Sequence, residues 1–359
     1  MTAPLPRIVH VASGREWRGG QRQVHLLAAA LQRQHVDQVV VTSRGSELAR
    51  RLERSGVRCH PVDWRRGLSL AALRAVWSEC RRGPAILHAH DAHALILAGL
   101  VAPLSRTPFV VTRRVDFPIR RPGFWIRADR VIAISDAVRA VLIKGAIPAD
   151  RITVVHSAID LDATRAVAAG SIRSQLGLPD AAPLAVSVAA LVPHKDHETM
   201  LRAAAIVHRS RPDLHWALAG DGPLRDRIET LARDLGVTPV IHLLGSIDRP
   251  LELIRAGSVF VMSSAEEGLG TSVLDAMALD IPVVATRAGG IPEMLDQGAG
   301  ILVPVGNPEA LAKGIETVLA DSTRRNQLIA TARERVAGFG ADGMAAGVLS
   351  VYRSVPLER

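Results

Sequence analysis

The sequence has little of several features that define common protein classes. Its 359 residues include two cysteines and one tyrosine, and aromatic side chains make up only 3%. The two cysteines, Cys59 and Cys80, are too few for a disulfide framework and lack metal-ligand spacing, so we expect reduced, buried thiols. Few aromatic side chains argue against binding of single-stranded nucleic acid, which depends on stacking platforms.

Long apolar runs are also missing. The longest, ALILAGLVAPL from Ala94 to Leu104, is far shorter than the about 20 residues that span a bilayer. The opening segment MTAPLPRIVHVAS has no basic stretch followed by an apolar one, so we expect no signal peptide. We therefore expect a cytoplasmic protein, with the inner face of the membrane as the other location to consider.

Acidic residues are scarce in the first half of the chain. Residues 1–160 carry 25 lysines and arginines against 12 aspartates and glutamates, whereas residues 161–359 carry 19 against 23. A basic half without a membrane-spanning segment predicts an anionic partner, such as a membrane surface or an acidic glycan or lipid. The shortage of aromatic residues leads us to expect no nucleic acid. A basic surface that only keeps the protein soluble stays open as the simpler interpretation.

Strand and helix patterns alternate along the chain and restart once. Short β-type runs such as RIVHVA, DQVVVTS and AILHAH alternate with helical segments up to RITVVHS, and LAVSVAAL begins a second series. Such alternation with short connections predicts two doubly wound parallel sheets, with a ligand outside the carboxyl ends of their strands. We expect an amino-terminal domain at 1–160, a linker at 161–182, a second domain at 183–335 and a helical segment at 336–359 that returns to the first domain.

The most informative stretch is SSAEEGLGTSVLDAMA, which starts at Ser263. Gly268 and Gly270 permit close backbone approach, and Thr271 or Ser272 is the expected N-cap of the following helix. A glycine loop that leads into a helix N-terminus presents free N–H groups to a phosphate. The carboxylates of Glu267 and Asp275 would repel a phosphate but could accept hydrogen bonds from sugar hydroxyls. A nucleotide-linked sugar offers both, although a capped helix with solvated acids explains the same spacing.

This stretch resembles the signature of retaining family-4-type glycosyltransferases with the GT-B fold, Ser-x-x-Glu-Gly-Phe-Gly-x-x-x-Leu-Glu-Ala-Met-Ala. Further segments resemble the family in order and spacing: REWRGGQRQVHLLAAAL, RVIAISDAVRAVLIKGAIPADRITVVHSAID, ALVPHKDHETML, LAGDGPLRDRIETLARDLGV, IPVVATRAGGIPEML and GILVPVGNPEALA. The resemblance covers most of the chain. It implies two Rossmann-like domains facing across a cleft, and a nucleotide diphosphate sugar as donor substrate, with no cofactor and no bound metal.

The resemblance also assigns roles. Glu267 would be the catalytic carboxylate beside the transferred sugar, Asp275 would bind the ribose hydroxyls, and Lys195 would meet the diphosphate as a point charge. The remaining donor-binding positions act mainly through backbone or close approach: Gly19, Gly20, Ser246, Gly268, Leu269, Gly270 and Thr271.

Four positions depart from the family pattern. Asp275 replaces a glutamate, Leu269 replaces a phenylalanine, and Ala190 stands where the family has an arginine for the diphosphate. Arg15, Arg18 and Arg22 of the amino-terminal loop are candidates to supply that lost guanidinium. Arg114 stands where many relatives have a histidine that contacts the transferred sugar.

Two groups in the first half are candidates for the acceptor or sugar side of the site. Arg113 and Arg114 lie in the basic run TRRVDFPIRR, which is either an anion-recognising edge or a solvated loop. His88, His90 and His93 follow a strand end, and alternation puts His88 and His90 on one face. No acidic or cysteine partner pattern supports zinc, so we expect no metal and a cleft-lining role for His90 or His93.

The leading hypothesis is a glycosyltransferase that moves a hexose-type sugar to a hydroxyl of a glycan or glycolipid acceptor, in cell-envelope polysaccharide or lipopolysaccharide synthesis. The basic half further predicts an anionic acceptor and peripheral contact with a membrane. The alternative, motivated by Ala190 and Asp275, is a GT-B protein that binds a sugar nucleotide without transferring it. A GT-B epimerase or phosphorylase is a further possibility. A Rossmann oxidoreductase is disfavoured because the first loop lacks Gly-x-Gly-x-x-Gly.

Overall fold

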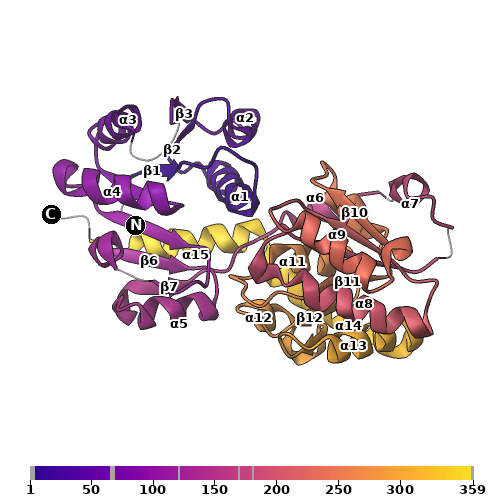
Figure 1. The fold of residues 1–359 in the computed structure, drawn as a ribbon. Helices are drawn as coiled ribbons and strands as arrows, with labels where there is room; N and C mark the ends of the chain where they lie inside the picture. The colour runs from indigo at the N-terminus through magenta and orange to yellow at the C-terminus, as the bar shows by residue number, and fades with distance from the viewer. Residues whose placement is uncertain (1–4, 65–68, 120–121, 169, 180–181, 357–359) are drawn as a thin grey trace. The chain divides into compact units, whose positions relative to one another are not determined.

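A computed structural model describes residues 5–64, 69–119, 122–168, 170–179 and 182–356. The chain forms two compact units, one of Met1–Ala158 with Gly340–Arg359 and one of Ile159–Phe339 (Figure 1). Each unit contains one parallel sheet with helices on both faces. The predicted pair of doubly wound α/β sheets is therefore confirmed.

The first unit has seven strands with helical connections. Its elements are β1 Arg7–Ala12, α1 Gly19–Arg33, β2 Gln38–Ser43, α2 Glu47–Arg54, β3 Cys59–Val62, α3 Leu70–Cys80, β4 Ala85–Ala89, α4 Ala92–Ser105, β5 Phe109–Arg113, the 3-10 turn η1 Gly123–Arg127, β6 Arg130–Ala133, α5 Asp136–Lys144, η2 Ala149–Arg151, β7 Ile152–Val154 and α15 Ala341–Arg353.

The strand order of this sheet is β3-β2-β1-β4-β5-β6-β7, and all neighbours are parallel. Because crossovers between parallel strands are right-handed, connections that run in opposite directions along the sheet cover opposite faces. Helices α1 and α2 therefore cover one face, whereas α3, α4, η1 and α5 cover the other. Helix α15, yellow in Figure 1, packs on α1 and β6 and completes the first of these layers.

The second unit has six strands. Its elements are α6 Leu161–Arg165, α7 Ile172–Gln175, β8 Leu184–Val188, η3 Pro193–Lys195, α8 His197–Ser210, β9 His215–Ala219, α9 Arg225–Asp234, η4 Thr238–Val240, β10 Ile241–Gly245, α10 Pro250–Arg255, β11 Val259–Met262, α11 Thr271–Ala278, β12 Val283–Thr286, α12 Ile291–Leu295, η5 Asp296–Gly298, β13 Ile301–Val303, α13 Pro308–Ala320, α14 Ser322–Val336 and η6 Ala337–Phe339.

Its strand order is β10-β9-β8-β11-β12-β13, again parallel throughout. The strands read as nearly continuous apolar runs because helices cover both faces of a parallel sheet. A buried core of helix and strand residues surrounds Trp216, which is 1% exposed. The two short helices α6 and α7 lie within residues 161–182, where a linker was expected.

A glycine fixes the end of β9 against the loop after β8. Gly220 has φ +145°, and a Cβ at this position would lie 1.9 Å from the carbonyl oxygen of Ala189. The amide of Gly220 donates to the carbonyl of Gly245, 2.8 Å away, which joins the end of β10 to the same place. Only a residue without a side chain allows these three strand ends to meet backbone to backbone.

We expect Gly220→Ala to destabilise the protein by more than about 3 kcal/mol, because the methyl group collides with backbone that has no room to move. Gly236→Ala is the matched control. Gly236 also has a positive φ, +72°, but nothing lies within 4 Å of its added Cβ, so about 1–2 kcal/mol of backbone strain is the whole expected cost. Urea unfolding of both variants measures the loss in free energy of unfolding. Equal losses would contradict the close contact between Gly220 and the carbonyl of Ala189.

Candidate active site

The candidate site of the second unit lies where its strand order reverses. Strands β8 and β11 are neighbours, but the chain leaves them toward opposite sides of the sheet. In doubly wound sheets, this reversal at the carboxyl ends leaves a crevice in which ligands bind. Lys195 belongs to η3, seven residues after β8, and Glu267 lies five residues after β11.

Lys195 and Glu267 form an ion pair at this reversal point. The Nζ atom of Lys195 donates to Oε2 of Glu267, and the hydroxyl of Ser264 lies 3.4 Å from the same oxygen. The two charged side chains are only 16% and 12% exposed. A largely buried pair of this kind is costly to separate, because each charge would lose its partner without regaining full hydration.

Backbone hydrogen bonds hold the two loops together. The amide of Ala265 donates to the carbonyl of His194, at 2.8 Å, and the hydroxyl of Ser263 donates to the carbonyl of Lys195, at 3.0 Å. On the other side, the amide of Gly290 donates to the carbonyl of Glu267, at 3.0 Å. The positions of both charged side chains are therefore set by the backbone and not by their own attraction alone.

The glycine loop leads into helix α11 as expected, but its N-cap differs from the prediction. The N-cap is Gly270, with φ +89°, and Thr271 is the first helical residue, so the assignment of the cap to Thr271 or Ser272 was wrong. No side chain caps the helix. The absence of a side-chain cap leaves the amides of Thr271 and Ser272 available to an anion. The amide of Val273 donates to the carbonyl of Gly270, at 2.9 Å.

The other donor-site positions fall around this loop. Gly268 and Leu269 are buried, and Asp275 is buried one turn into α11. Ser246 is exposed and directly follows β10, beside the Gly220–Gly245 contact. The exposed methyl group of Ala190 provides no hydrogen-bond donor.

The strand order of the first unit also reverses once, between β1 and β4. Asp91 joins the two strand ends here. Its carboxylate accepts from the amide and the hydroxyl of Ser13, both at 2.6 Å, and from the amide of Ala94, at 2.9 Å. Asp91 is thus both the N-cap of α4 and the anchor of the loop after β1.

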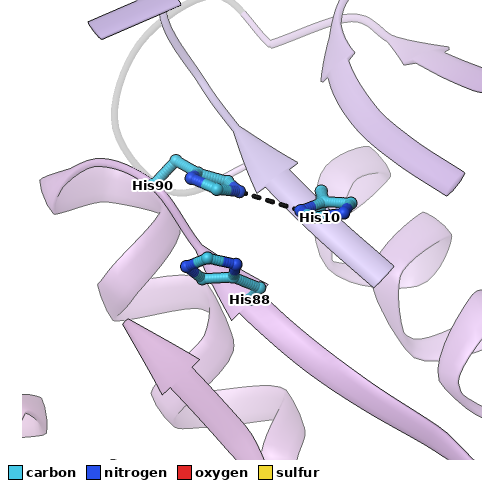
Figure 2. Close-up of side chains that lie close together, drawn as sticks. All are labelled: His10, His88 and His90. Carbon is cyan, nitrogen blue, oxygen red and sulfur yellow. Dashed lines mark hydrogen bonds between the residues drawn. The ribbon is translucent and has the colours of Figure 1, made fainter. Parts of the chain in front are cut away.

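Three buried histidines lie beneath this junction (Figure 2). His10 on β1 and His90 after β4 are joined by a hydrogen bond of 2.9 Å between Nδ1 and Nε2. His88 bonds through Nδ1 to the hydroxyl of Tyr352, and through Nε2 to Thr112, both at 2.7 Å. The only tyrosine of the sequence therefore attaches helix α15 to the centre of the sheet.

Arg114 fixes the proton positions in this network. Its Nη2 donates to Nδ1 of His90, at 3.3 Å, so Nε2 of His90 must donate to Nδ1 of His10. Burial lowers the pKa of His10 to about 3 and holds the pKa values of His88 and His90 well below their ordinary range. The Gln38 side chain opposes this shift at His10 but lies outside ordinary hydrogen-bond geometry. All three imidazoles are neutral at pH 7.

Three neutral imidazoles whose ring nitrogens lie within 4.8 Å could in principle hold a metal ion. Here both nitrogens of His88 are engaged, and the cation of Arg114 would repel a second positive charge. The expectation of no metal stays a prediction. The cluster also differs from the group considered in the sequence, because His10 joins it, whereas His93 is exposed on α4.

Arg114 lies beneath the start of α1. Its Cδ lies 3.8 Å from where a Cβ of Gly20 would be, and its Nε is buried without a hydrogen-bond partner among the described residues. Burial lowers the pKa of Arg114 to about 10 against the opposing charge of Asp91, so it remains a cation at pH 7. Gly19 and Gly20 were expected in a loop, but they are the first residues of α1, whose N-terminus has no side-chain cap.

Arg113 has a structural role that the sequence did not suggest. Its Nε and Nη2 donate to the carbonyls of Val115 and Phe117, at 2.9 and 2.6 Å, and its guanidinium lies 5.3 Å from the ring centre of Trp125. These contacts brace the loop after β5. The sequence analysis also missed His10, Tyr352 and Asp91, which come together only in the folded sheet.

Two family models match the chain in succession. The model described as Glycosyltransferase Family 4 matches residues 17–163, and the model described as Glycosyl transferases group 1 matches residues 169–335. The matched segments contain both sheets except for β1, which precedes the first segment and forms one side of the first reversal point. The chain belongs to the family-4-type glycosyltransferases with the GT-B fold.

Relatives of known name share part of their length with this chain. A lipopolysaccharide core biosynthesis glycosyltransferase, LpsE, of Rhizobium meliloti is 34% identical over 51% of this chain and 54% of the relative. A D-inositol 3-phosphate glycosyltransferase of Kineococcus radiotolerans is 34% identical over 65% and 58%. The chain thus spans a little over half the length of these relatives. Among solved structures, Anabaena Alr3699/HepE with UDP and glucose has a TM-score of 0.85 at 20% identity, covering 97% and 100% of the two chains, which supports the fold.

The neutral histidines predict a loss of stability in mild acid. In the unfolded chain their pKa is about 6.5, above the folded value of about 3 for His10. The contribution of His10 to the free energy of unfolding is therefore fully present above pH 6.5 and declines below it. The decline is up to about 1.4 kcal/mol per pH unit for each proton that the unfolded chain binds and the folded chain does not.

Thermal unfolding between pH 7.5 and pH 5.5 measures this slope. We expect His10→Gln to flatten this slope, relative to the unchanged protein, by about half a proton on average over this range and by close to one proton at its acid end. His93→Gln, at an exposed position of the same unit, is the control and should leave the slope as it was. A slope that is the same in all three proteins would contradict neutral burial of His10.

Proposed function

We propose that this chain is a retaining glycosyltransferase that moves a hexose-type sugar from a nucleotide diphosphate sugar to a hydroxyl of a glycan or glycolipid. The observation that carries the proposal is the Lys195–Glu267 pair beside the uncapped start of α11, at the reversal point of the second sheet. A cation and free N–H groups suit a diphosphate, and a carboxylate beside them suits sugar hydroxyls.

In this proposal the donor is held by three groups of different chemistry. Lys195 binds the diphosphate as it turns from Glu267, and the first N–H groups of α11 bind the same oxygens. Glu267, released from part of its ion pair, accepts hydrogen bonds from the transferred sugar. Asp275 accepts from the ribose hydroxyls. Gly268, Leu269 and Thr271 contribute backbone, and the base lies near Ser246.

The transfer itself needs no covalent intermediate on the protein. The bond between the anomeric carbon and the leaving phosphate oxygen breaks, and the acceptor oxygen bonds to that carbon from the same face. The acceptor's hydroxyl proton passes to the departing phosphate oxygen, so atoms and charges balance. Lys195 and the helix end stabilise the negative charge that grows on the leaving group, and we expect no bound metal and no cofactor.

We assign the acceptor or sugar side to the first unit. Arg114 is a partly buried cation whose Nε has no hydrogen-bond partner among the described residues. We propose that it binds an anionic part of a substrate, with His90 beside it. His93 and Arg113 are weaker candidates, since Arg113 donates to its own loop. Relatives named for lipopolysaccharide core and inositol phosphate glycosylation favour an anionic envelope acceptor and a place at the inner face of the membrane.

The second candidate function is a protein that binds a sugar nucleotide without transferring the sugar. The observation that favours it is Ala190, whose exposed methyl group gives the diphosphate no guanidinium. Donor binding without transfer or hydrolysis would support this alternative.

A thermal-shift screen against UDP, GDP, ADP, CMP and their common sugars tests donor binding. We expect stabilisation by one nucleoside diphosphate and its sugar, with and without magnesium, because Lys195 and the helix end supply the positive charge. Lys195→Met should abolish the shift, whereas Lys313→Met, at an exposed position of α13, should retain it. No shift with any compound would contradict the proposed site.

With the donor known, Glu267→Gln tests the catalytic assignment. We expect turnover to fall by about a hundredfold or more, because the amide is a weaker acceptor and leaves Lys195 without its carboxylate. Glu266→Gln is the matched control, since this neighbouring side chain is exposed and its turnover should be unchanged. If both variants turn over donor equally, Glu267 has no catalytic role.

A further inference from the structure

The exposed large apolar side chains of the first unit gather on one of its two helical layers. Of the eight that are exposed among the described residues of the whole chain, six lie on α3, α4, η1 and α5. Helices α1, α2 and α15 on the opposite layer carry none. The six are Leu70, Trp77, Ile96, Leu104, Ile126 and Ile143, and we call the surface they form the α3–α5 face.

Helix α4 is the most unusual part of this face. An ordinary surface helix turns charged and polar side chains to the solvent, but no charged residue occurs between Asp91 and Arg106. Its outward residues are uncharged and mostly apolar, and Leu104 is 71% exposed. These outward residues are Ala92, His93, Ile96, Leu100, Pro103 and Leu104. The solvent side of α4 is therefore apolar, whereas the solvent side of a surface helix is normally charged or polar.

Basic side chains surround the apolar ones. The four helical segments 70–82, 92–106, 122–127 and 136–144 carry seven lysines and arginines and two acids, and one of these acids, Glu79, is buried. Five of these arginines and Lys144 make no ion pair with another described residue. The five arginines are Arg74, Arg81, Arg106, Arg127 and Arg139.

Two hollows open along the ends of these helices. One of about 290 Å³ is lined by Arg81 and Arg106, and one of about 500 Å³ is lined by Ile126 with Arg127, Arg130 and Arg151. Both hollows present guanidinium groups, which suit a phosphate. The second also has apolar walls and the carboxylate of Asp129, whereas the lining of the first is mainly polar.

We propose that the α3–α5 face binds the surface of a bilayer that contains anionic phospholipids. Basic side chains near such a surface gain about 1 kcal/mol each from its negative potential, and apolar side chains between them enter the boundary of head groups and acyl chains. A second copy of the chain is a poorer occupant, because two such faces would bring like charges together. No helix of the described residues is long and apolar enough to cross the bilayer, so the contact is peripheral.

Co-sedimentation of the full chain with vesicles tests this surface. We expect binding to vesicles that contain phosphatidylglycerol, little binding to pure phosphatidylcholine, and weakening by salt. The double variant Ile96→Glu, Leu104→Glu should reduce the affinity at least about tenfold, because it places two carboxylates against the anionic surface.

The matched control makes the same charge change on the opposite layer. Ala346→Glu with Ser350→Glu alters two exposed positions of α15 and should leave vesicle binding unchanged. Trp77, which is 44% exposed, gives a second readout. The tryptophan fluorescence of the protein should shift to shorter wavelength on anionic vesicles, and this shift should be smaller in Trp77→Phe.

Three results would overturn the proposal: no binding to anionic vesicles, equal loss in both double variants, or a dimer in solution that Ile96→Glu, Leu104→Glu dissociates. The inference rests on the first unit alone. Because the assay contains no sugar nucleotide, its failure is distinct from a failure of the donor screen, which reports on Lys195 and the second unit.

Discussion

The uniform direction of the strands is the constraint on which both candidate sites depend. In a parallel sheet every strand ends at the same edge, and each sheet here reverses its strand order once, between β1 and β4 and between β8 and β11. Chain segments distant in sequence therefore meet there: Ser13 with Asp91, and Lys195 with Glu267. The backbone contacts among the loops after β8, β9, β10 and β11 then leave the charged side chains little freedom, so that a ligand meets groups whose positions are already set.

The buried polar side chains at the two reversal points are stabilised in different ways. In the second unit, a cation and a carboxylate neutralise each other, and separating them is favourable only if a ligand offers both a replacement anion and replacement donors. In the first unit, burial keeps three imidazoles neutral. One hydrogen-bond chain runs from Arg114 through His90 to His10, and a second joins Tyr352 of α15 to His88 and Thr112. The guanidinium of Arg114 is the charge at the end of the first chain.

Much of this could be predicted from the sequence, for identifiable physical reasons. Apolar strand runs, periodic helices and the glycine loop after β11 depend on local pattern, so the two doubly wound sheets and the crevice loop were expected. The N-cap of α11 was misplaced because Gly270 and Thr271 are both good caps, and only the backbone torsion decides between them. His10, Tyr352 and Asp91 could not be found because their partners are distant in sequence: 80 residues separate His10 from His90, 78 separate Ser13 from Asp91, and 264 separate His88 from Tyr352.

The departures from the family pattern gain a physical meaning once the charges are placed. Among the residues that directly follow β8 and β11, 189–196 and 263–270, Lys195 is the only lysine or arginine. With alanine at 190, these two segments would offer the proposed diphosphate site one side-chain cation and one helix end, which is weaker than a site with a guanidinium fork. In the first unit, Arg114 occupies the position where many relatives have a histidine, and its buried, half-satisfied guanidinium has bonding capacity to spare. Compared with the family pattern, the chain has one arginine fewer after β8 and one more after β5. Under the proposed function, a substrate with more anionic groups than a simple sugar nucleotide is the partner that this arrangement would favour.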